Sequence, residues 1–287
     1  MQTMLFGSHV SAAGGVQNAP ANATAVGCET FQLFTRSPRG GAAPKLTKEI
    51  VTAFKNECKK YGFTTCYVHT PYFINFASAN TRVRQGSATI VRDELNRSSL
   101  LGVTALMTHL GSSKDFTIQK AQALVVAGLL KLLDGYTGTT KFLIEIAAGQ
   151  GLILGAKFEE VALYITAVEK KNKKLKNKIG VCFDTCHAFA SGYDLKTPQA
   201  VKKTLAHFDQ TIGLDRLVLI HANDSKFDLG GKRDRHEHIG QGKIGAAGFR
   251  ALVTNPKLKN VDFILETPKE GDADQKNLAL LKSFRKK

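Results

Sequence analysis

The sequence has no tryptophan, few cysteines and no long apolar run. No apolar stretch approaches the roughly 20 residues that a helix needs to cross a bilayer, which argues against an integral membrane protein. The five cysteines are an odd number without paired spacing, so they predict reduced thiols that pack as small apolar side chains. Residues 1–9 carry neither a basic segment nor a long apolar one, and we therefore expect no signal peptide and a cytoplasmic protein.

Several common motifs are also missing. The chain contains no Walker A motif and no G-x-G-x-x-G fingerprint, because residues 240–242 supply only a G-x-G fragment. It contains no G-x-S-x-G nucleophile elbow, so serine hydrolase chemistry has no support. Cys186 is a thiol without a cysteine partner, which is more typical of a packing residue than of a metal ligand. The chemistry of this chain must therefore come from other residue types.

Short apolar runs alternate with amphipathic stretches along the whole chain. The runs predict strands at residues 4–10, 28–34, 65–69, 103–109, 141–145, 179–184, 216–221 and 261–266. Helical spacing of apolar residues predicts helices up to about residue 26, at 47–61, 84–101, 118–133, 158–168, 198–212 and 246–253, and from about residue 273.

Alternating strands and helices require parallel strands with right-handed crossovers. Eight such pairs in 287 residues favour an α/β fold, a (β/α)8 TIM barrel, with an open doubly wound sheet as the alternative. No composition shift or linker divides the chain. We therefore expect one domain over residues 1–287.

Ionisable residues stand at the ends of the predicted strands. In residues 180–187 a buried strand stops at Asp184, and His187 follows three residues later. A single Asp of this kind is more often a turn former or helix cap, and a single His is more often structural. However, six consecutive strands end in this way, at His69, His109, Glu145, Asp184, His221 and Glu266. The loops add His187, Asp234 and His236.

The carboxyl ends of all strands in a parallel barrel open on one face, where active sites are built. We therefore expect these nine nitrogen and oxygen ligands to converge on that face. A catalytic zinc ion needs only three protein ligands, so nine suffice for three ions if one carboxylate bridges two of them. The other histidines, His9, His207 and His238, are expected to be structural.

Lys and Arg outnumber Asp and Glu by 40 to 24, which favours a polyanionic partner such as nucleic acid or a membrane surface. The densest basic run, residues 169–178, precedes the sixth strand and so belongs to the opposite face, where a solvated surface is the favoured interpretation. On the expected metal face, Tyr72 and Phe73 can either enter a base stack or pack within their loop. The basic residues that can neutralise phosphates there are Arg36, Arg39, Lys45, Lys114, Lys226, Lys232, Arg233 and Arg235.

Motifs spread along the chain resemble those of one family. They are residues 7–15 (GSHVSAAGG), 69–75 (HTPYFIN), Glu145 with 148–151 (AGQG), 180–194 (GVCFDTCHAFASGYD), 221–226 (HANDSK), 234–236 (DRH) with 239–242 (IGQG), and 265–267 (LET). At these residues the sequence resembles endonuclease IV, the zinc-dependent apurinic/apyrimidinic endonuclease family of DNA repair. It departs from that family at residues 40–43, which read GGAA where members commonly have a Trp. Phe73 also replaces a residue that is often Leu, and Gln241 replaces an acidic residue seen in relatives.

The resemblance implies three zinc ions, with Mn²⁺ as an alternative at one position. By that analogy the three sets of ligands are His69, His109 and Glu145; Glu145, Asp184, His221 and Glu266; and His187, Asp234 and His236. The resemblance also implies that Glu145 bridges two ions and that Glu266 orients the nucleophile. It places Arg39, Tyr72 and Phe73 where the family inserts side chains into DNA at the lesion.

The implied activity belongs to base excision repair. The enzyme, expected to be a monomer, would act on double-stranded DNA and hydrolyse the phosphodiester 5′ to an abasic site, leaving a 3′-hydroxyl and a 5′-deoxyribose phosphate. It would also trim blocked 3′ ends. A hydroxide bridging the first two zinc ions would attack phosphorus, and the third ion would stabilise the leaving oxygen. Two other classes remain open, a sugar isomerase with the same barrel and a non-catalytic basic DNA-binding barrel, although neither needs nine ligands.

Overall fold

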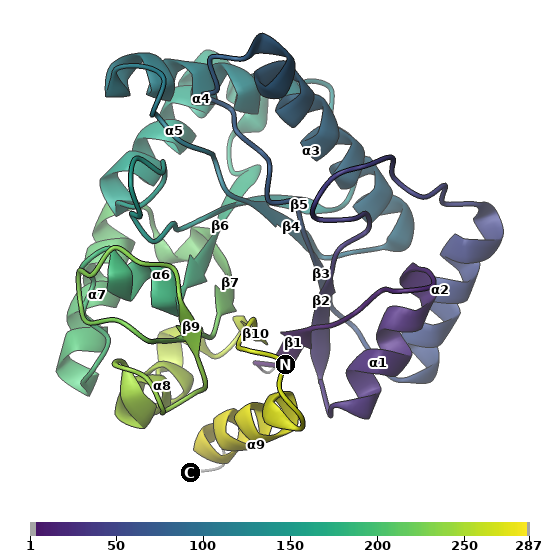
Figure 1. Ribbon diagram of the computed structural model, residues 1–287, viewed down its shortest axis with the longest axis vertical. Helices are drawn as coiled ribbons and strands as arrows, with labels where there is room; N and C mark the ends of the chain where they lie inside the picture. Colours follow the sequence, from purple (N-terminus) through teal and green to yellow (C-terminus); the bar gives the residue numbers. More distant parts are fainter. Residues whose placement is uncertain (1–3, 286–287) are drawn as a thin grey trace.

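Eight parallel strands form a closed barrel in the computed structural model, which describes residues 4–285 (Figure 1). The barrel strands are β1 (Phe6–His9), β2 (Thr30–Leu33), β3 (Cys66–His69), β4 (Ala105–Thr108), β5 (Lys141–Glu145), β6 (Ile179–Asp184), β7 (Leu217–His221) and β10 (Asp262–Leu265). The first strand, β1, pairs in parallel with both β2 and β10, so the sheet closes on itself. The predicted TIM barrel is therefore confirmed, and the open doubly wound sheet is wrong.

Helices cover the outside of the barrel (Figure 1). They are α1 (Ala19–Ala25), α2 (Lys48–Lys60), α3 (Thr81–Leu101), α4 (Ile118–Leu133), α5 (Phe158–Lys171), α7 (Pro198–Thr211), α8 (Gly245–Val253) and α9 (Ala273–Arg285). Short 3-10 turns lie at Val16–Asn18, Lys173–Leu175, Leu214–Arg216 and Pro256–Leu258. The Asn80 side chain accepts the backbone N–H of Arg82 and Val83, which explains why α3 begins three residues before its predicted start. Within residues 4–285, no helix combines the length and apolar character that a membrane span requires.

Apolar side chains fill two separate spaces. The larger core lies between strands and helices and includes Phe31, Phe142 and Phe183, all fully buried. Inside the barrel, the side chains that alternate with these form a smaller cluster of Tyr67, Ala105, Met107, Leu143, Cys182, Leu219 and Ile264. At the amino-terminal end of the barrel, the hydroxyls of Tyr67 and Thr65 both donate to Asp262 at 2.8 Å. Packed side chains thus fill the lower barrel, and the ionisable groups lie above them at its carboxyl end.

Three short elements near the carboxyl ends of the strands were not predicted. The short helix α6 (Thr185–Ala190) follows β6 without a loop. The long segment after β7, expected to be an irregular loop, contains an antiparallel pair, β8 (Asp224–Ser225) and β9 (His236–Glu237). The Asp224 carboxylate accepts backbone N–H groups from Gly240, Gly242 and Ile244 within 3.0 Å and so fixes the end of this segment. The pairing places His236 next to the carboxyl end of β10, where its Nδ1 lies 2.9 Å from the Glu266 carbonyl.

Candidate metal centre

The nine predicted ligands converge on the carboxyl face of the barrel. They fall into three sets, and within each set one ligand atom per residue lies within 4.8 Å of the others. The sets are His69, His109 and Glu145; Glu145, Asp184, His221 and Glu266; and His187, Asp234 and His236. These are the same three sets that the family resemblance implies.

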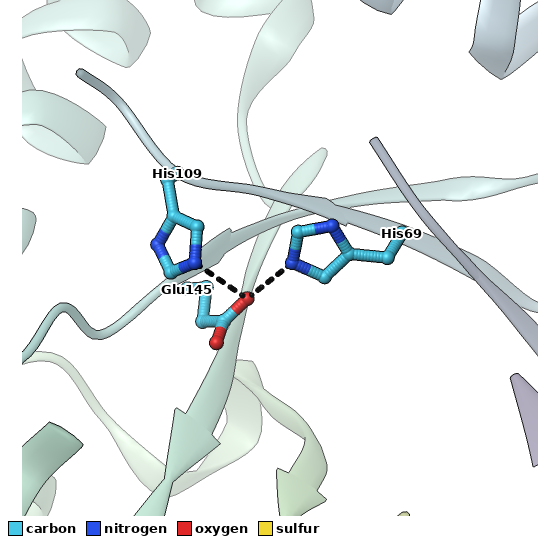
Figure 2. A group of neighbouring side chains, drawn as sticks. All are labelled: His69, His109 and Glu145. Atoms are coloured by element: carbon cyan, nitrogen blue, oxygen red, sulfur yellow. Dashed lines mark hydrogen bonds and ion pairs between the residues drawn. The ribbon is translucent and has the colours of Figure 1, made fainter. Parts of the chain in front are cut away.

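The first set draws on three neighbouring strands. His69 ends β3, His109 follows β4 and Glu145 ends β5, so parallel pairing places them side by side. The Nε2 atoms of His69 and His109 lie 2.9 and 3.7 Å from the same Glu145 oxygen, Oε2. Figure 2 shows both rings turning a nitrogen toward that oxygen. Three ligand atoms therefore face one point, as a tetrahedral zinc site with an open position requires.

The second set uses the other oxygen of Glu145. His221 Nδ1 lies 3.2 Å from Glu145 Oε1, 3.3 Å from Glu266 Oε2 and 3.8 Å from Asp184 Oδ2. Glu145 and Asp184 are almost completely buried, with at most 1% of the residue exposed. Because its two oxygens face different sets, the Glu145 side chain has the geometry of a bridging ligand.

The third set forms where α6 and β9 meet. His187 Nε2 and His236 Nε2 lie 3.1 and 3.2 Å from Asp234 Oδ1. Locally, Asp184 caps α6, since its Oδ1 accepts the His187 backbone N–H at 2.8 Å. The helix-cap interpretation of Asp184 is therefore correct, and the same side chain keeps Oδ2 directed toward the second set.

In three of the ligand histidines, hydrogen bonds fix which ring nitrogen is free. The Nδ1 atoms of His69, His187 and His236 lie 2.6, 3.0 and 2.9 Å from the backbone carbonyls of residues 70, 146 and 266. A carbonyl only accepts, so these Nδ1 atoms carry hydrogen and leave the Nε2 lone pairs for the cluster. The Nε2 atoms of His187 and His236 then face each other at 3.4 Å. Two lone pairs at that distance repel unless a cation or a proton lies between them, so the donor set fits a bound metal ion.

The electrostatics of the cluster lead to the same conclusion. Burial raises the pKa of Glu145, but the facing imidazoles outweigh burial and hold the pKa well below its ordinary value. Burial lowers the pKa of His187 and His236, but facing carboxylates raise the His187 pKa well above normal and the His236 pKa to about 9. The four carboxylates of the centre thus require compensating positive charge, which divalent cations provide on binding, with release of protons.

An open cavity of about 930 Å³ lies above the ligands. Tyr72 and Phe73 stand at its rim with 68% and 39% of their surface exposed, which argues against simple packing within their loop. The Tyr72 backbone N–H donates to the Pro38 carbonyl at 3.1 Å, so this loop is joined to the neighbouring loop that carries the exposed Arg39. The three side chains expected to enter DNA therefore belong to two adjoining loops.

Comparison with known proteins identifies the family. A family model described as the xylose isomerase-like TIM barrel matches residues 20–286. A protein of Chloroflexus aurantiacus named probable endonuclease 4 is 38% identical over 282 residues, which cover 97% of both chains. The crystal structure of endonuclease IV from Thermus thermophilus superposes with a TM-score of 0.86 at 34% identity, covering 98% of this chain and 99% of that one. The chain belongs to the endonuclease IV family. The predicted family and the nuclease class of enzyme are thereby confirmed.

The barrel is shared beyond the endonuclease IV family. A D-tagatose 3-epimerase-like protein superposes with a TM-score of 0.73 over 99% of this chain, but its sequence is only 19% identical. At that identity the likeness shows the fold alone. This comparison therefore shows that the sugar-isomerase alternative shares the barrel fold, and it gives no support for a sugar substrate.

In this endonuclease IV homologue, one basic residue expected to contact DNA, Arg36, instead forms ion pairs within the protein. Arg36 was expected to neutralise phosphates, but its guanidinium pairs with Asp93 and donates to Glu94 at 2.6 Å, leaving 8% of its side chain exposed. That expectation is wrong, because the two α3 carboxylates already compensate this charge. The lysine-rich run 169–178 does lie before β6, on the face opposite to the metal centre, as predicted.

Cys186 and His207 agree with their structural interpretation. Cys186 is buried, and burial raises the pKa of its thiol to about 12, which disfavours the thiolate that binds metals. It lies near Asp184 and His236, but its Sγ contacts the Arg235 carbonyl at 3.6 Å. His207 pairs with Glu159 on the surface at 2.7 Å, away from the centre.

Two residues that support the endonuclease IV centre were missed. Asn223 donates from Nδ2 to Asp184 Oδ2 at 2.7 Å and accepts the Glu266 backbone N–H at 2.8 Å. Gln32 is fully buried in β2 and touches both Glu266 and His221. A polar amide within the apolar run 28–34 was the available signal for Gln32, because a buried amide needs partners.

Proposed function

We propose that this protein is an apurinic/apyrimidinic endonuclease of base excision repair. It hydrolyses the phosphodiester 5′ to an abasic site in double-stranded DNA, leaving a 3′-hydroxyl and a 5′-deoxyribose phosphate. It also removes blocking groups from 3′ ends, since these are joined to DNA by the same kind of bond. The observation that carries the proposal is the convergence of nine nitrogen and oxygen ligands in three sets below an open cavity.

The metal ions proposed for the three sets are Zn²⁺, with Mn²⁺ as an alternative at one of them. Imidazole and carboxylate ligands without a thiolate are typical of catalytic rather than structural zinc. When bound, the ions lower the pKa of a coordinated water toward 7 and neutralise charge on the phosphate. Glu145 joins the first and second sets because its two oxygens face different partners.

The side chains of this protein supply the positioning. Glu266 keeps Oε2 toward the second set while Oε1 accepts from Gln32, so its orientation is fixed before substrate binds. In this position Glu266 orients the attacking water relative to phosphorus. The water oxygen forms the new bond to phosphorus, the bond from phosphorus to the 3′ oxygen breaks, and that oxygen takes up a proton.

Selectivity for the lesion comes from the rim. Arg39, Tyr72 and Phe73 are proposed to enter the duplex and occupy the space of the missing base. Entry of these side chains bends the duplex and unstacks a nucleotide. Unstacking costs a few kcal/mol for a paired base and least where the base is absent, so a bend of this kind selects abasic sites. Lys232 and Arg233, exposed in the segment between β8 and β9, are available to the flanking phosphates.

The test is incision of a duplex that carries one tetrahydrofuran abasic-site analogue. Zinc-loaded protein is expected to give one product cut 5′ to the analogue, with activity lost after prolonged chelation and restored by Zn²⁺. A matched duplex with an intact base is the substrate control. Binding without incision would support the non-catalytic DNA-binding barrel, and turnover of a ketose in place of DNA would support the sugar isomerase.

A further inference from the structure

Gln32 lies at the centre of a hydrogen-bond network that joins two metal-ligand candidates. It belongs to β2, outside the nine ligands, and no part of its surface is exposed. Its Nε2 lies 2.6 Å from Glu266 Oε1 and 2.8 Å from His9 Nδ1, and its Oε1 lies 2.8 Å from His221 Nε2. Both amide hydrogens and the carbonyl oxygen are therefore used.

The contact with Glu266 determines which way the amide faces. An ionised carboxylate only accepts hydrogen bonds, so the NH₂ group must face Glu266. The opposite assignment would place two acceptor oxygens 2.6 Å apart. The amide oxygen then faces His221 Nε2, which must donate a hydrogen to it. The same reasoning makes His9 Nδ1 an acceptor, with the hydrogen of its neutral ring on Nε2.

His221 consequently differs from three of the other histidine candidates. With hydrogen on Nε2, its lone pair is on Nδ1, the atom that lies 3.2 Å from Glu145 Oε1 and 3.3 Å from Glu266 Oε2. In His69, His187 and His236 the hydrogen is on Nδ1 and is held by a backbone carbonyl. A backbone carbonyl is fixed by the fold, whereas the partner of His221 is a side chain that substitution can remove.

We propose that Gln32 is a positioning residue of the metal centre, which sets the Nε2–H form of His221 and directs Glu266 Oε2 toward the second set of ligands. This inference rests on the metal centre of the proposed function. Removing a side chain that orients metal ligands costs about 10- to 100-fold in metal affinity. The loss should be confined to the second set, because the hydrogen bonds of Gln32 to ligand candidates go to Glu266 and His221, which both belong to that set.

The variant that tests this is Gln32→Met, which keeps the length of the side chain and removes every hydrogen bond. Zinc content and the stepwise affinities are measured by competition with a chromophoric chelator. We expect one of three zinc ions to bind about 10- to 100-fold more weakly and the other two to bind as in wild type. Unchanged affinity for all three ions, or equal weakening of all three, would overturn the proposal.

A control variant at the other end of the barrel separates positioning from general destabilisation. Tyr67→Phe removes a hydrogen bond of 2.8 Å from the Tyr67 hydroxyl to Asp262, which is none of the nine ligand candidates. It is expected to lower Tm while leaving all three zinc affinities unchanged. If Tyr67→Phe weakens zinc binding as much as Gln32→Met does, the effect of Gln32 is not positional and the proposal fails.

A spectroscopic measurement on the wild type gives a result even if Gln32→Met fails to fold. Two-bond ¹⁵N–¹H couplings report which imidazole nitrogen carries hydrogen. In zinc-loaded protein we expect hydrogen on Nε2 of His221 and on Nδ1 of His69, His187 and His236. Hydrogen on Nδ1 of His221, or a wild type that binds no zinc at the second set, overturns the inference. Protein that passes these tests but fails to cut abasic DNA refutes only the proposed function.

Discussion

Arg97 on α3 holds both ends of the loop that carries Arg39. Its Nη2 and Nη1 donate to the backbone carbonyls of Thr35 and Pro44, each at 2.8 Å, and its Nε donates to the Thr35 hydroxyl at 3.2 Å. Glu94, which is fully buried, accepts from Thr35 at 2.5 Å and lies 3.4 Å from Arg97. Between these two anchors the loop contains two glycines with positive φ, Gly40 and Gly41, so its own backbone offers little rigidity.

We therefore expect Arg97→Met to loosen this loop. Two charged hydrogen bonds to carbonyls contribute about 1.5 kcal/mol each at the lower end of their range, so the free energy of unfolding should fall by about 3 kcal/mol. With an unfolding entropy of about 2.1 cal/mol/K per residue, a chain of 287 residues should then lose roughly 5 °C in Tm. DNA containing an abasic site should bind more weakly, because ordering the loop adds an entropy cost to binding.

Three measurements on Arg97→Met check this reasoning: calorimetric Tm at fixed zinc, zinc content, and affinity for abasic duplex. Zinc content should match wild type, since Arg97 contacts none of the nine ligand candidates among the described residues. Lys131→Met, which removes an exposed contact with Gln85, is the matched control and should change neither Tm nor affinity appreciably. A stable Arg97→Met variant with wild-type affinity for abasic DNA would refute the anchoring role.

Three further predictions follow from the site and the barrel. Glu145→Gln should weaken the binding of two of the three zinc ions, because an amide offers only one acceptor oxygen. Incision should fall at least 100-fold with the fold intact, and near-normal incision would refute the bridging role. Tyr72→Ala should raise KM for abasic DNA with zinc content unchanged, and an unchanged KM measured on duplex would remove Tyr72 from the DNA contacts. Burial raises the pKa of Asp262. Asp262 therefore stabilises the folded protein most at pH values below about 3.9, the ordinary pKa of an Asp side chain, and this stabilisation is lost as the pH rises through the raised pKa. The difference in unfolding free energy between wild type and Asp262→Asn should therefore shrink with rising pH from about 4, whereas a constant difference would contradict the shift.

The sequence allowed the barrel and the ligand face to be predicted because both follow from local patterns. A strand such as β6 is marked by its apolar run, and its last residue must lie on the carboxyl face once the barrel closes. His69, Glu145 and Asp184 end their strands as expected, while His109 and Glu266 come one residue after theirs. Strand position was therefore enough to predict that these ligands meet on one face of the barrel, whereas their division into three sets came from the family resemblance.

Contacts across long sequence distances could not be predicted in the same way. Arg36 finds its carboxylates on α3, 57 and 58 residues away, and nothing local marks that pairing. The helix α6 has only six residues, too few for a helical period to stand out. The pairing of β8 with β9 involves two residues on each side and depends on Asp224 and its backbone donors, a network visible only in the folded chain.

Anomalous scattering at the zinc absorption edge, from crystals of zinc-loaded protein, tests the proposed centre most directly. We predict three zinc peaks on the carboxyl face of the barrel, with Glu145 between the first two and with His221 contributing Nδ1 to the second. The third peak should lie among His187, Asp234 and His236. A single peak, or peaks held by other residues, would contradict the trinuclear centre on which the proposed incision chemistry depends.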